Sequence, residues 1–264
     1  MVVTQTTDGT ALLNALVSSQ GQFSGLNATY SAGDASQVGT YTGFTSSPVI
    51  MSNGVVLSTG HAADTTAASH DTGNTPSTDL SGGSTSEIDS YAPGHITNWT
   101  SSHDAAKLTL NFSLAAASAV SFQFSFGSVE YPEFVDNFTD AFFAFLDGNQ
   151  VSFDSHGNPV QVGASFASSL TTADTNTAFG DPHGLVGVLT TTSGQLLAGD
   201  HTISFEVADT NDGALDSAVF LTNFTTAENT GGPVTTAVPE PASMATIGMG
   251  LLGLGWARRR RAKA

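Results

Sequence analysis

Large apolar and small polar side chains alternate with a period of two in the middle of the sequence, and this pattern limits the chain to β-structure. Two runs place their apolar residues on one strand face each: Leu108, Leu110, Phe112 and Leu114, then Val120, Phe122, Phe124 and Phe126. Successive side chains of a strand point to opposite faces, so each run predicts a strand with one buried face. Similar runs at 140–147, 201–208 and 217–224 predict further strands. The fold class predicted is all-β, an antiparallel β-sandwich of jelly-roll type.

Residues 8–20 are the only segment outside the tail that predicts a helix, a short one near the N-terminus. Thr7 or Asp8 can cap it, and its apolar side chains share one face. Those side chains are Leu12, Leu13, Leu16 and Val17.

Two other segments interrupt the strand pattern. Residues 49–57 are apolar but contain Asn53-Gly54, a typical turn pair, and so predict a hairpin or a bulge. Residues 61–89 have almost no large apolar side chain and predict a long loop.

The charge of the chain is strongly negative and unevenly placed. Five of the six basic residues lie after residue 257, so residues 1–237 carry Lys107 alone against 22 aspartates and glutamates. Such a surface repels phosphates and has no basic patch, which excludes nucleic-acid binding. One lysine cannot neutralise these carboxylates, so they must be solvated, hydrogen-bonded or paired with metal cations.

The last 27 residues, 238–264, combine three features in a fixed order. Val238, Pro239, Glu240 and Pro241 come first, and the uncharged apolar stretch 242–257 predicts a short transmembrane helix. A membrane-stop basic cluster follows, made of Arg258, Arg259, Arg260 and Arg261. Arginines stay on the cytoplasmic side, so residues 1–237 are expected on the outer side of the inner membrane. A plain single-span anchor is the alternative interpretation.

This order of Pro-Glu-Pro, apolar segment and arginine cluster resembles the PEP-CTERM sorting signal of Gram-negative bacteria. The resemblance implies an exosortase as processing partner, with cleavage near the Pro-Glu-Pro, and a host that makes extracellular polysaccharide or biofilm. Met1 to Thr7 offer neither a basic nor an apolar region, so we expect the secretory signal peptide upstream of this start.

The body of the chain resembles the choice-of-anchor L domain, an extracellular bacterial domain found with interchangeable C-terminal anchors. Its most specific stretches are Glu-Tyr-Pro-Glu-Phe at 130–134 and Asp-Ser-Ala-Val-Phe at 216–220, while Val129 stands where the family leads us to expect an acidic residue. The resemblance implies surface display without an established catalytic activity. The domain organisation expected is a lead at 1–7, the domain at 8–226, a Thr/Pro/Gly linker at 227–237 and the sorting signal at 238–264.

Oxygen-bearing side chains gather at two predicted strand ends. Glu130 and Asp140 lie in one group, and the other holds Asp209, Asp212 and Asp216. Calcium takes six to eight oxygen ligands and accepts loops of this kind. The hypothesis is a calcium ion held by Glu130, Asp140 and Asp216, with Asp209 or Asp212 assisting. The alternative is that these are turn residues whose carboxylates accept backbone hydrogen bonds.

The sequence offers little for catalysis. It has no cysteine, no Gly-x-Ser-x-Gly turn and no zinc-binding spacing among its seven histidines. We therefore predict a non-enzymatic extracellular protein that acts in adhesion, in matrix or biofilm assembly, or in binding to extracellular polysaccharide or other surface proteins. Tyr91 and Trp99 are candidate sugar contacts. The alternative is a calcium-dependent glycan-active hydrolase, because paired carboxylates can cleave glycosidic bonds.

Overall fold

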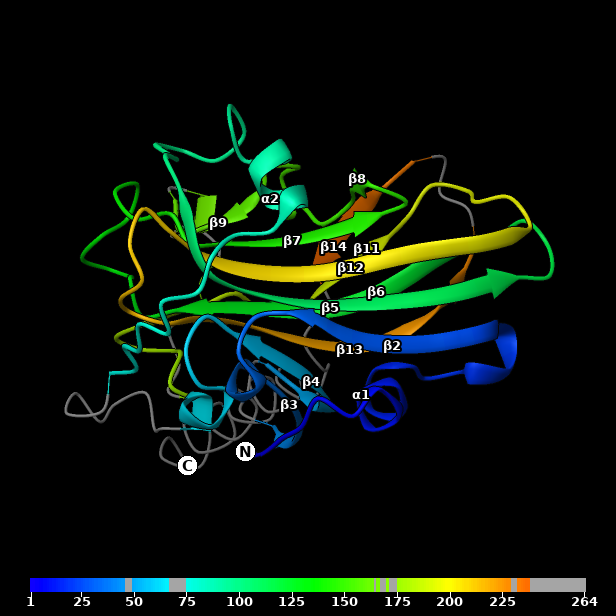
Figure 1. Cartoon of the computed structure of the whole chain (residues 1–264), viewed down its shortest axis with the longest axis horizontal. Helices are drawn as coiled ribbons and strands as arrows, with labels where there is room; N and C mark the ends of the chain where they lie inside the picture. Colours follow the sequence, from blue (N-terminus) through cyan, green and yellow to red (C-terminus); the bar gives the residue numbers. More distant parts are fainter. Residues whose placement is uncertain are drawn as a thin grey trace, which may run out of the picture.

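The structure is a computed structural model that describes residues 1–45, 49–66, 75–163, 165–166, 170, 175–228 and 232–237. Its strands form an eight-stranded and a six-stranded sheet, and every strand pairing within them is antiparallel. Figure 1 shows the long strands β5 and β12 of the six-stranded sheet side by side, with β2 and β7 next to them. The predicted antiparallel β-sandwich is confirmed in this form, and the predicted transmembrane helix lies outside the described residues.

In both sheets, strands that are far apart in the sequence lie side by side. The larger sheet has the order β1-β3-β4-β13-β6-β11-β14, with β10 also paired to β6, and the smaller has the order β2-β5-β12-β7-β8, with β9 also paired to β7. The strands of the larger sheet are β1 (Val2–Gln5), β3 (Val38–Phe44), β4 (Met51–Ser58), β6 (Ala119–Ser128), β10 (Gly184–Leu185), β11 (Leu189–Thr192), β13 (Ser217–Ala227) and β14 (Val234–Ala237). Those of the smaller sheet are β2 (Ser24–Ala32), β5 (Ser102–Leu114), β7 (Ala141–Leu146), β8 (Asn149–Gln150), β9 (Val160–Gln161) and β12 (Gly199–Thr210).

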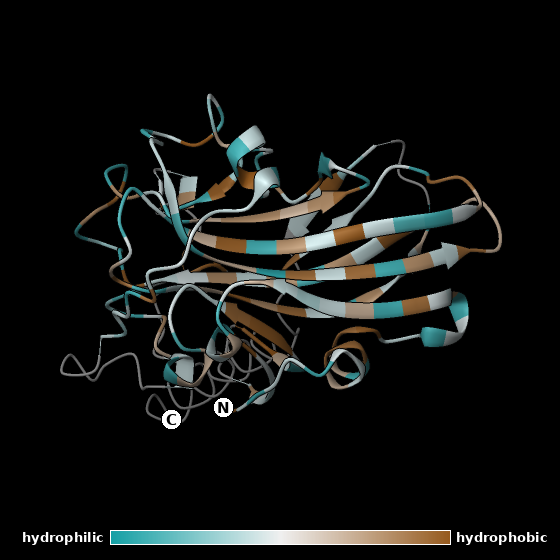
Figure 2. Cartoon of the chain, viewed as in Figure 1, coloured by the Kyte–Doolittle hydropathy of each residue, from teal (hydrophilic) through white to brown (hydrophobic). Residues whose placement is uncertain are grey.

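The main core lies between the sheets and is rich in phenylalanine. Phe122 of β6 and Phe205 of β12 meet with ring centroids 5.0 Å apart, and Phe124 of β6 lies 4.9 Å from Phe142 of β7. Apolar and polar residues alternate along β5 and β12, as Figure 2 shows, so each strand buries one face against the other sheet. All eight apolar residues of the two alternating runs are buried, as the sequence predicted.

The N-terminal helix α1 spans Gly9–Leu16, and is shorter than the predicted 8–20. Asp8 is its N-cap, because its carboxylate accepts a hydrogen bond from the Thr10 amide at 2.8 Å. Leu12, Leu13 and Leu16 are buried in the main core, as the predicted apolar face required. A 3₁₀ turn at Gln20–Gln22 follows.

The predicted hairpin or bulge at Asn53-Gly54 is wrong, because both residues lie inside the continuous strand β4, which pairs with β3 without a shift in register. Thr42 and Tyr41 of β3 pair with Asn53 and Gly54. A side chain at Gly54 would overlap the backbone carbonyl of Leu221 and the ring of Tyr41. This glycine allows close packing between neighbouring strands and makes no turn.

The prediction of one long loop at 61–89, with no second helix, is also wrong. Residues Ala62–Thr66 form a 3₁₀ turn, and Ser86–Tyr91 form the short helix α2. Thr85 caps α2 by accepting a hydrogen bond from the Ile88 amide. Ile88 is fully buried against Phe143 and Phe145 on the outer face of β7. Tyr91 of the same helix packs edge-on against both rings.

The segment expected to be a linker, 227–237, contributes strand β14. β14 pairs with β11 from Leu189↔Ala237 to Thr192↔Val234. The Thr191 and Thr235 hydroxyls lie 2.9 Å apart across this pair. Threonine and valine fit a pleated sheet edge well, which explains why a Thr-rich segment pairs with the sheet.

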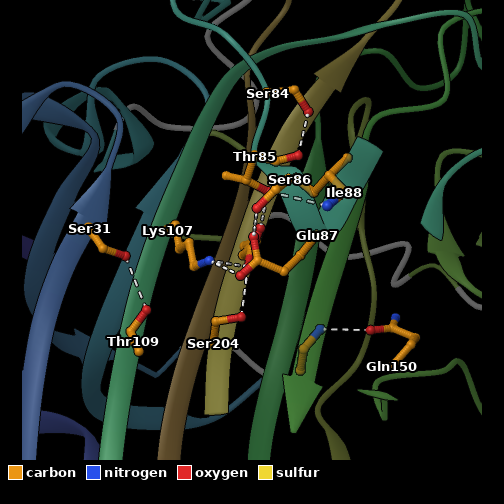
Figure 3. Close-up of polar contacts among 12 residues, drawn as sticks. Ser31, Ser84, Thr85, Ser86, Glu87, Ile88, Lys107, Thr109, Gln150 and Ser204 are labelled. Atoms are coloured by element: carbon orange, nitrogen blue, oxygen red, sulfur yellow. Dashed lines mark hydrogen bonds and ion pairs between the residues drawn. The ribbon is translucent and has the colours of Figure 1, made fainter. Parts of the chain in front are cut away.

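Lys107 lies on the outer face of β5 and contacts two glutamates (Figure 3). Its Nζ contacts Glu87 of α2 and lies 3.3 Å from Glu206 Oε1 on β12. Glu206 is fully buried, and its carboxylate also accepts hydrogen bonds from Thr85 and, at 2.7 Å, from Ser204. The only lysine of residues 1–237 therefore ties α2 to the smaller sheet.

Candidate functional site

Four of the five candidate calcium ligands are buried together at one end of the sandwich. Glu130 follows the end of β6 and Asp140 precedes β7, while Asp209 lies near the end of β12 and Asp216 precedes β13. The antiparallel pairings place these strand ends at the same edge, because Ala208 pairs with Ala141 and Ser217 pairs with Ser128. We call Glu130, Asp140, Asp209 and Asp216 the buried carboxylate cluster, which bridges the two sheets.

Asp140 is the well-bonded member of the cluster. Its side chain has no exposed surface. The Thr210 amide donates to one of its oxygens at 3.0 Å, and the Ser217 hydroxyl donates to the other at 2.7 Å. These two donors connect β12 and β13, so Asp140 links the two sheets through one carboxylate.

The other three cluster members carry unpartnered oxygens. Among the described residues, the buried side-chain oxygens without a hydrogen-bond partner are Glu130 Oε2, Asp209 Oδ1, Asp209 Oδ2 and Asp216 Oδ2. Asp209 is fully buried, and Glu130 and Asp216 are each 1% exposed. Burying a carboxylate without a partner costs several kcal/mol, so something other than the protein's own donors is needed to offset this cost.

The pKa values of the cluster reflect this unfavourable burial. Burial and the neighbouring charge of Asp140 raise the pKa of Glu130 to about 9. Burial raises the pKa of Asp140 to about 7 against the hydrogen bonds of Ser217 and Thr210, and raises the pKa of Asp216 to about 6. Burial, with the charges of Asp140 and Asp216, raises the pKa of Asp209 well above its usual range. The cluster can therefore be held either by shared protons or by a cation.

Asp212, the fifth candidate, is only partly buried. Its Oδ1 accepts a hydrogen bond from the Ala214 amide at 3.3 Å, as the alternative interpretation of a turn residue expects. Its charge still contributes to raising the pKa of Glu130, so it lies at the border of the cluster.

Sequence reasoning missed several residues that support the cluster. The buried Gln37 amide donates to the carbonyls of Ser58, Thr59 and Asp104 at 3.1, 2.8 and 2.6 Å. Gly60 leaves room for the Asp216 carboxylate, which a side chain there would overlap. No local pattern marks these residues, because their partners are far away in the sequence.

The position of the cluster does not favour the hydrolase alternative. Asp140 and Asp209 have no exposed surface, and Glu130 and Asp216 have almost none. A glycosidase needs its two carboxyl groups on either side of a bound sugar. A polysaccharide chain cannot reach these carboxylates while the sandwich is folded.

The outer face of the smaller sheet carries two hollows. One, of about 370 Å³, lies beside α2 and is lined in part by Glu87, Tyr91, His95 and Phe145. The exposed His95 ring stacks on Tyr91 with centroids 4.2 Å apart. Trp99, the other predicted sugar contact, does not line this hollow, because it packs beside α2 and donates to the Ser102 hydroxyl at 2.8 Å.

The second hollow, of about 420 Å³, lies over β5 and β12. Asn111 and Thr202 line it and are exposed, and the Thr202 hydroxyl donates to the Asn111 side chain at 2.9 Å. Asp147 lines its far side, and the next residue, Gly148, lines the first hollow. The two hollows therefore meet at the turn that follows β7.

His201 and Asp147 form an ion pair in the second hollow, with Nδ1 and Oδ2 2.7 Å apart. Burial lowers the pKa of His201, but the hydrogen bond and charge of Asp147 outweigh it and raise that pKa above 6.5. The ion pair therefore stabilises the folded protein fully below about pH 6.5, the usual pKa of histidine. This stabilisation is lost as the pH rises through the pKa of His201 in the folded protein.

Relative to a His201→Gln variant, we expect the parent to gain up to about 1 kcal/mol of unfolding free energy between pH 8 and pH 6. Urea unfolding of both proteins at each pH measures this difference and cancels the titration of other groups. His156→Gln, a change at an exposed histidine, is the control. A parent-to-variant difference that is the same at both pH values would contradict the expectation.

The sequence also matches a known family. The family model of the choice-of-anchor L domain matches residues 2–225. This chain belongs to the choice-of-anchor L domain family. The match includes the buried carboxylate cluster and the residues named above for both hollows, so all of them are parts of the choice-of-anchor L domain.

The residues after the choice-of-anchor L domain match a second model, the PEP-CTERM protein-sorting motif, at 237–261. This motif marks an exported cell-envelope protein that is processed by an exosortase, as the sequence predicted. Val238, Pro239, Glu240, Pro241 and the arginine cluster fall outside the described residues. In the part of the chain that is described, no helix is long and apolar enough to cross a membrane.

Solved structures resemble the choice-of-anchor L domain only weakly. TmCBM61, solved in complex with β-1,4-galactotriose, is 12% identical, with a TM-score of 0.30 over 83% of this chain and 99% of its own. A β-glucosidase from Kluyveromyces marxianus and the catalytic unit of a GH87 α-1,3-glucanase from Streptomyces thermodiastaticus are 9% and 15% identical, with TM-scores of 0.21 and 0.18. Each covers 45% of this chain, which spans only 11% and 20% of their lengths. No curated protein matches the sequence.

Proposed function

We propose that the choice-of-anchor L domain of this chain acts at the cell surface, without catalysis, by binding extracellular polysaccharide and so supporting adhesion or matrix assembly. The observation that carries the proposal is the pair of adjoining hollows on the outer face of the smaller sheet. Binding sites for small ligands combine a concave surface with aromatic side chains and a few polar groups. The first hollow has Tyr91, His95 and Phe145 as rings and Glu87 as a polar group.

The charges around the hollows restrict the kind of polysaccharide. Glu87 lines the first hollow, and Asp147 and Asp200 line the second. Lys107 is already paired with Glu87 and Glu206. Asp147 is paired with His201 in the same way, and among the described residues no lysine or arginine lines either hollow. An anionic polymer would find no free lysine or arginine to bind there, so the proposed ligand is a neutral, hydroxyl-rich polysaccharide.

The experiment is a screen of neutral and anionic polysaccharides against the purified protein, by glycan array and then by calorimetric titration. Binding of a neutral glycan without release of reducing ends is expected. His95→Ala, at an exposed ring of the first hollow, and Asn111→Ala, at an exposed amide of the second, should each weaken binding by about tenfold, the loss of one good contact. Thr42→Ala, at an exposed position on β3 of the other sheet, should leave binding unchanged.

Two results would contradict this proposal. No binding to any polysaccharide, or equal binding by the parent and both hollow variants, would mean that the hollows are not a sugar site. Release of reducing ends by the parent protein would instead support the glycan-active hydrolase.

A further inference from the structure

We propose that the buried carboxylate cluster binds one calcium ion, which bridges the two sheets at the end of the sandwich. The inference concerns a site separate from the hollows and stands whether or not they bind sugar. Its ligands would come from Glu130, Asp140, Asp209 and Asp216, which all lie at strand ends on the same edge.

The unpartnered oxygens are the first observation behind the proposal. Both oxygens of Asp209 and one oxygen each of Glu130 and Asp216 are buried without a hydrogen bond. The Thr59 hydroxyl lies 3.4 Å from the Ser217 carbonyl and also acts on Asp209, whose pKa it lowers, so it offsets only part of the cost of burying this carboxylate. Native proteins rarely leave buried carboxylate oxygens without a partner. These four oxygens therefore indicate a bound cation that they coordinate.

The second observation is that no lysine or arginine side chain of the described residues pairs with the cluster. Lys107 is the only lysine or arginine among residues 1–237, and Glu87 and Glu206 hold it on the outer face of the smaller sheet. Apart from protons on the carboxyls themselves, the cationic side chain in the described part of the chain that acts on the cluster is His61, whose charge lowers the pKa of Asp216.

The donor set selects calcium among the common cations. All candidate ligand atoms are carboxylate, hydroxyl or backbone oxygens, which are the ligands of hard cations, and no cysteine exists in the chain. Among the described residues, no three acidic, histidine or cysteine side chains are already gathered into a metal-binding arrangement, so the carboxylates must draw together around the ion. Calcium tolerates variable geometry and ligand number, whereas magnesium demands a near-ideal octahedron.

Asp216 is held on one side only and leaves one oxygen for a ligand. The Thr78 amide donates to its Oδ1 at 2.7 Å and fixes one side of the carboxylate. Its Oδ2 is free, and Gly60 beside it has no side chain that would block it. Oδ2 of Asp216 therefore lies in the space left by the missing Gly60 side chain, while Oδ1 keeps its hydrogen bond.

The test uses the full chain, stripped with EDTA and titrated with calcium chloride at pH 7.5 and physiological salt. Calorimetry should give one calcium per chain. The melting temperature should rise by roughly 5–10 °C when calcium exceeds its dissociation constant about 100-fold. Magnesium at the same concentration should give a much smaller rise. No heat and no rise in melting temperature at millimolar calcium would overturn the proposal.

Asp209→Asn is the decisive variant, because it removes a buried charge and keeps the shape of the side chain. It should weaken calcium binding at least about tenfold and, in EDTA, melt at or above the parent temperature. Asp216→Asn serves the same purpose if Asp209→Asn does not fold. Asp89→Asn, at an exposed aspartate of α2, is the matched control and should bind calcium like the parent. Full affinity in both cluster variants, or a protein stabilised only by lowering the pH, would mean that shared protons hold the cluster.

Discussion

Replacing Lys107 with methionine is expected to destabilise the domain by about 3 kcal/mol, the usual loss when one partner is removed from a buried ion pair. Glu206 has no exposed surface, and its remaining contacts in the pair are the hydroxyls of Thr85 and Ser204. Burial already raises the pKa of Glu206 against the charge of Lys107. Without Lys107 this carboxyl must take up a proton or draw water into the packing under α2.

A double-mutant cycle tests this explanation. The Lys107→Met, Glu206→Gln protein should be more stable than Lys107→Met alone, since the uncompensated charge is gone. Lys107→Arg should retain most of the stability, because it keeps a cation at the same position. The deficit of Lys107→Met should shrink as the pH falls, because Glu206 protonates more readily in that variant. Urea unfolding at pH 5 and pH 8 measures the unfolding free energy of each variant. If the losses in Lys107→Met and Glu206→Gln simply add in the double variant, Lys107 does not compensate the charge of Glu206.

Replacing Glu240 with alanine is expected to change processing from nearly complete to undetectable in the host that makes this protein. Glu240 is the central residue of the Pro-Glu-Pro sequence within the matched sorting motif. An exosortase that reads this motif should leave the variant uncut, and the apolar segment 242–257 should then keep it with the membrane.

Immunoblots of membrane and extracellular fractions, with mass spectrometry of the C-terminus, give the readout. Glu228→Ala removes a glutamate upstream of the motif and should be processed like the parent. If Glu240→Ala is released with the same C-terminus as the parent, the motif is not what the enzyme reads. If the parent itself keeps residues 238–264, the C-terminal segment is a plain single-span membrane anchor, which is the alternative interpretation.

Most of the strands could be predicted from the sequence, because the core between two sheets demands a period of two. Phe122, Phe124 and Phe205 all belong to such runs and all lie in the main core. The helix α2 could not be predicted in this way, since Ile88 is its only fully buried large residue. Asn53-Gly54 was misleading for a related reason: Gly54 is required by contact with Leu221, which is far away in the sequence.

The members of the buried carboxylate cluster could be proposed as a group, because each lies next to a predicted strand end. Antiparallel pairing then brings the end of one strand to the start of the next. Which oxygens have partners could not be predicted, since this depends on donors such as Thr210 and Ser217 that only the folded chain brings to Asp140. The sequence also grouped Asp212 with these residues, but it is only partly buried.

Strand β14 has a consequence for secretion. It ends at Ala237 as the last strand of the larger sheet, and the Pro-Glu-Pro context starts with the very next residue, Val238. In the sequence, no residue lies between the end of this strand and that motif. Cleavage near Pro-Glu-Pro would therefore leave β14, still paired with β11, as part of the released domain.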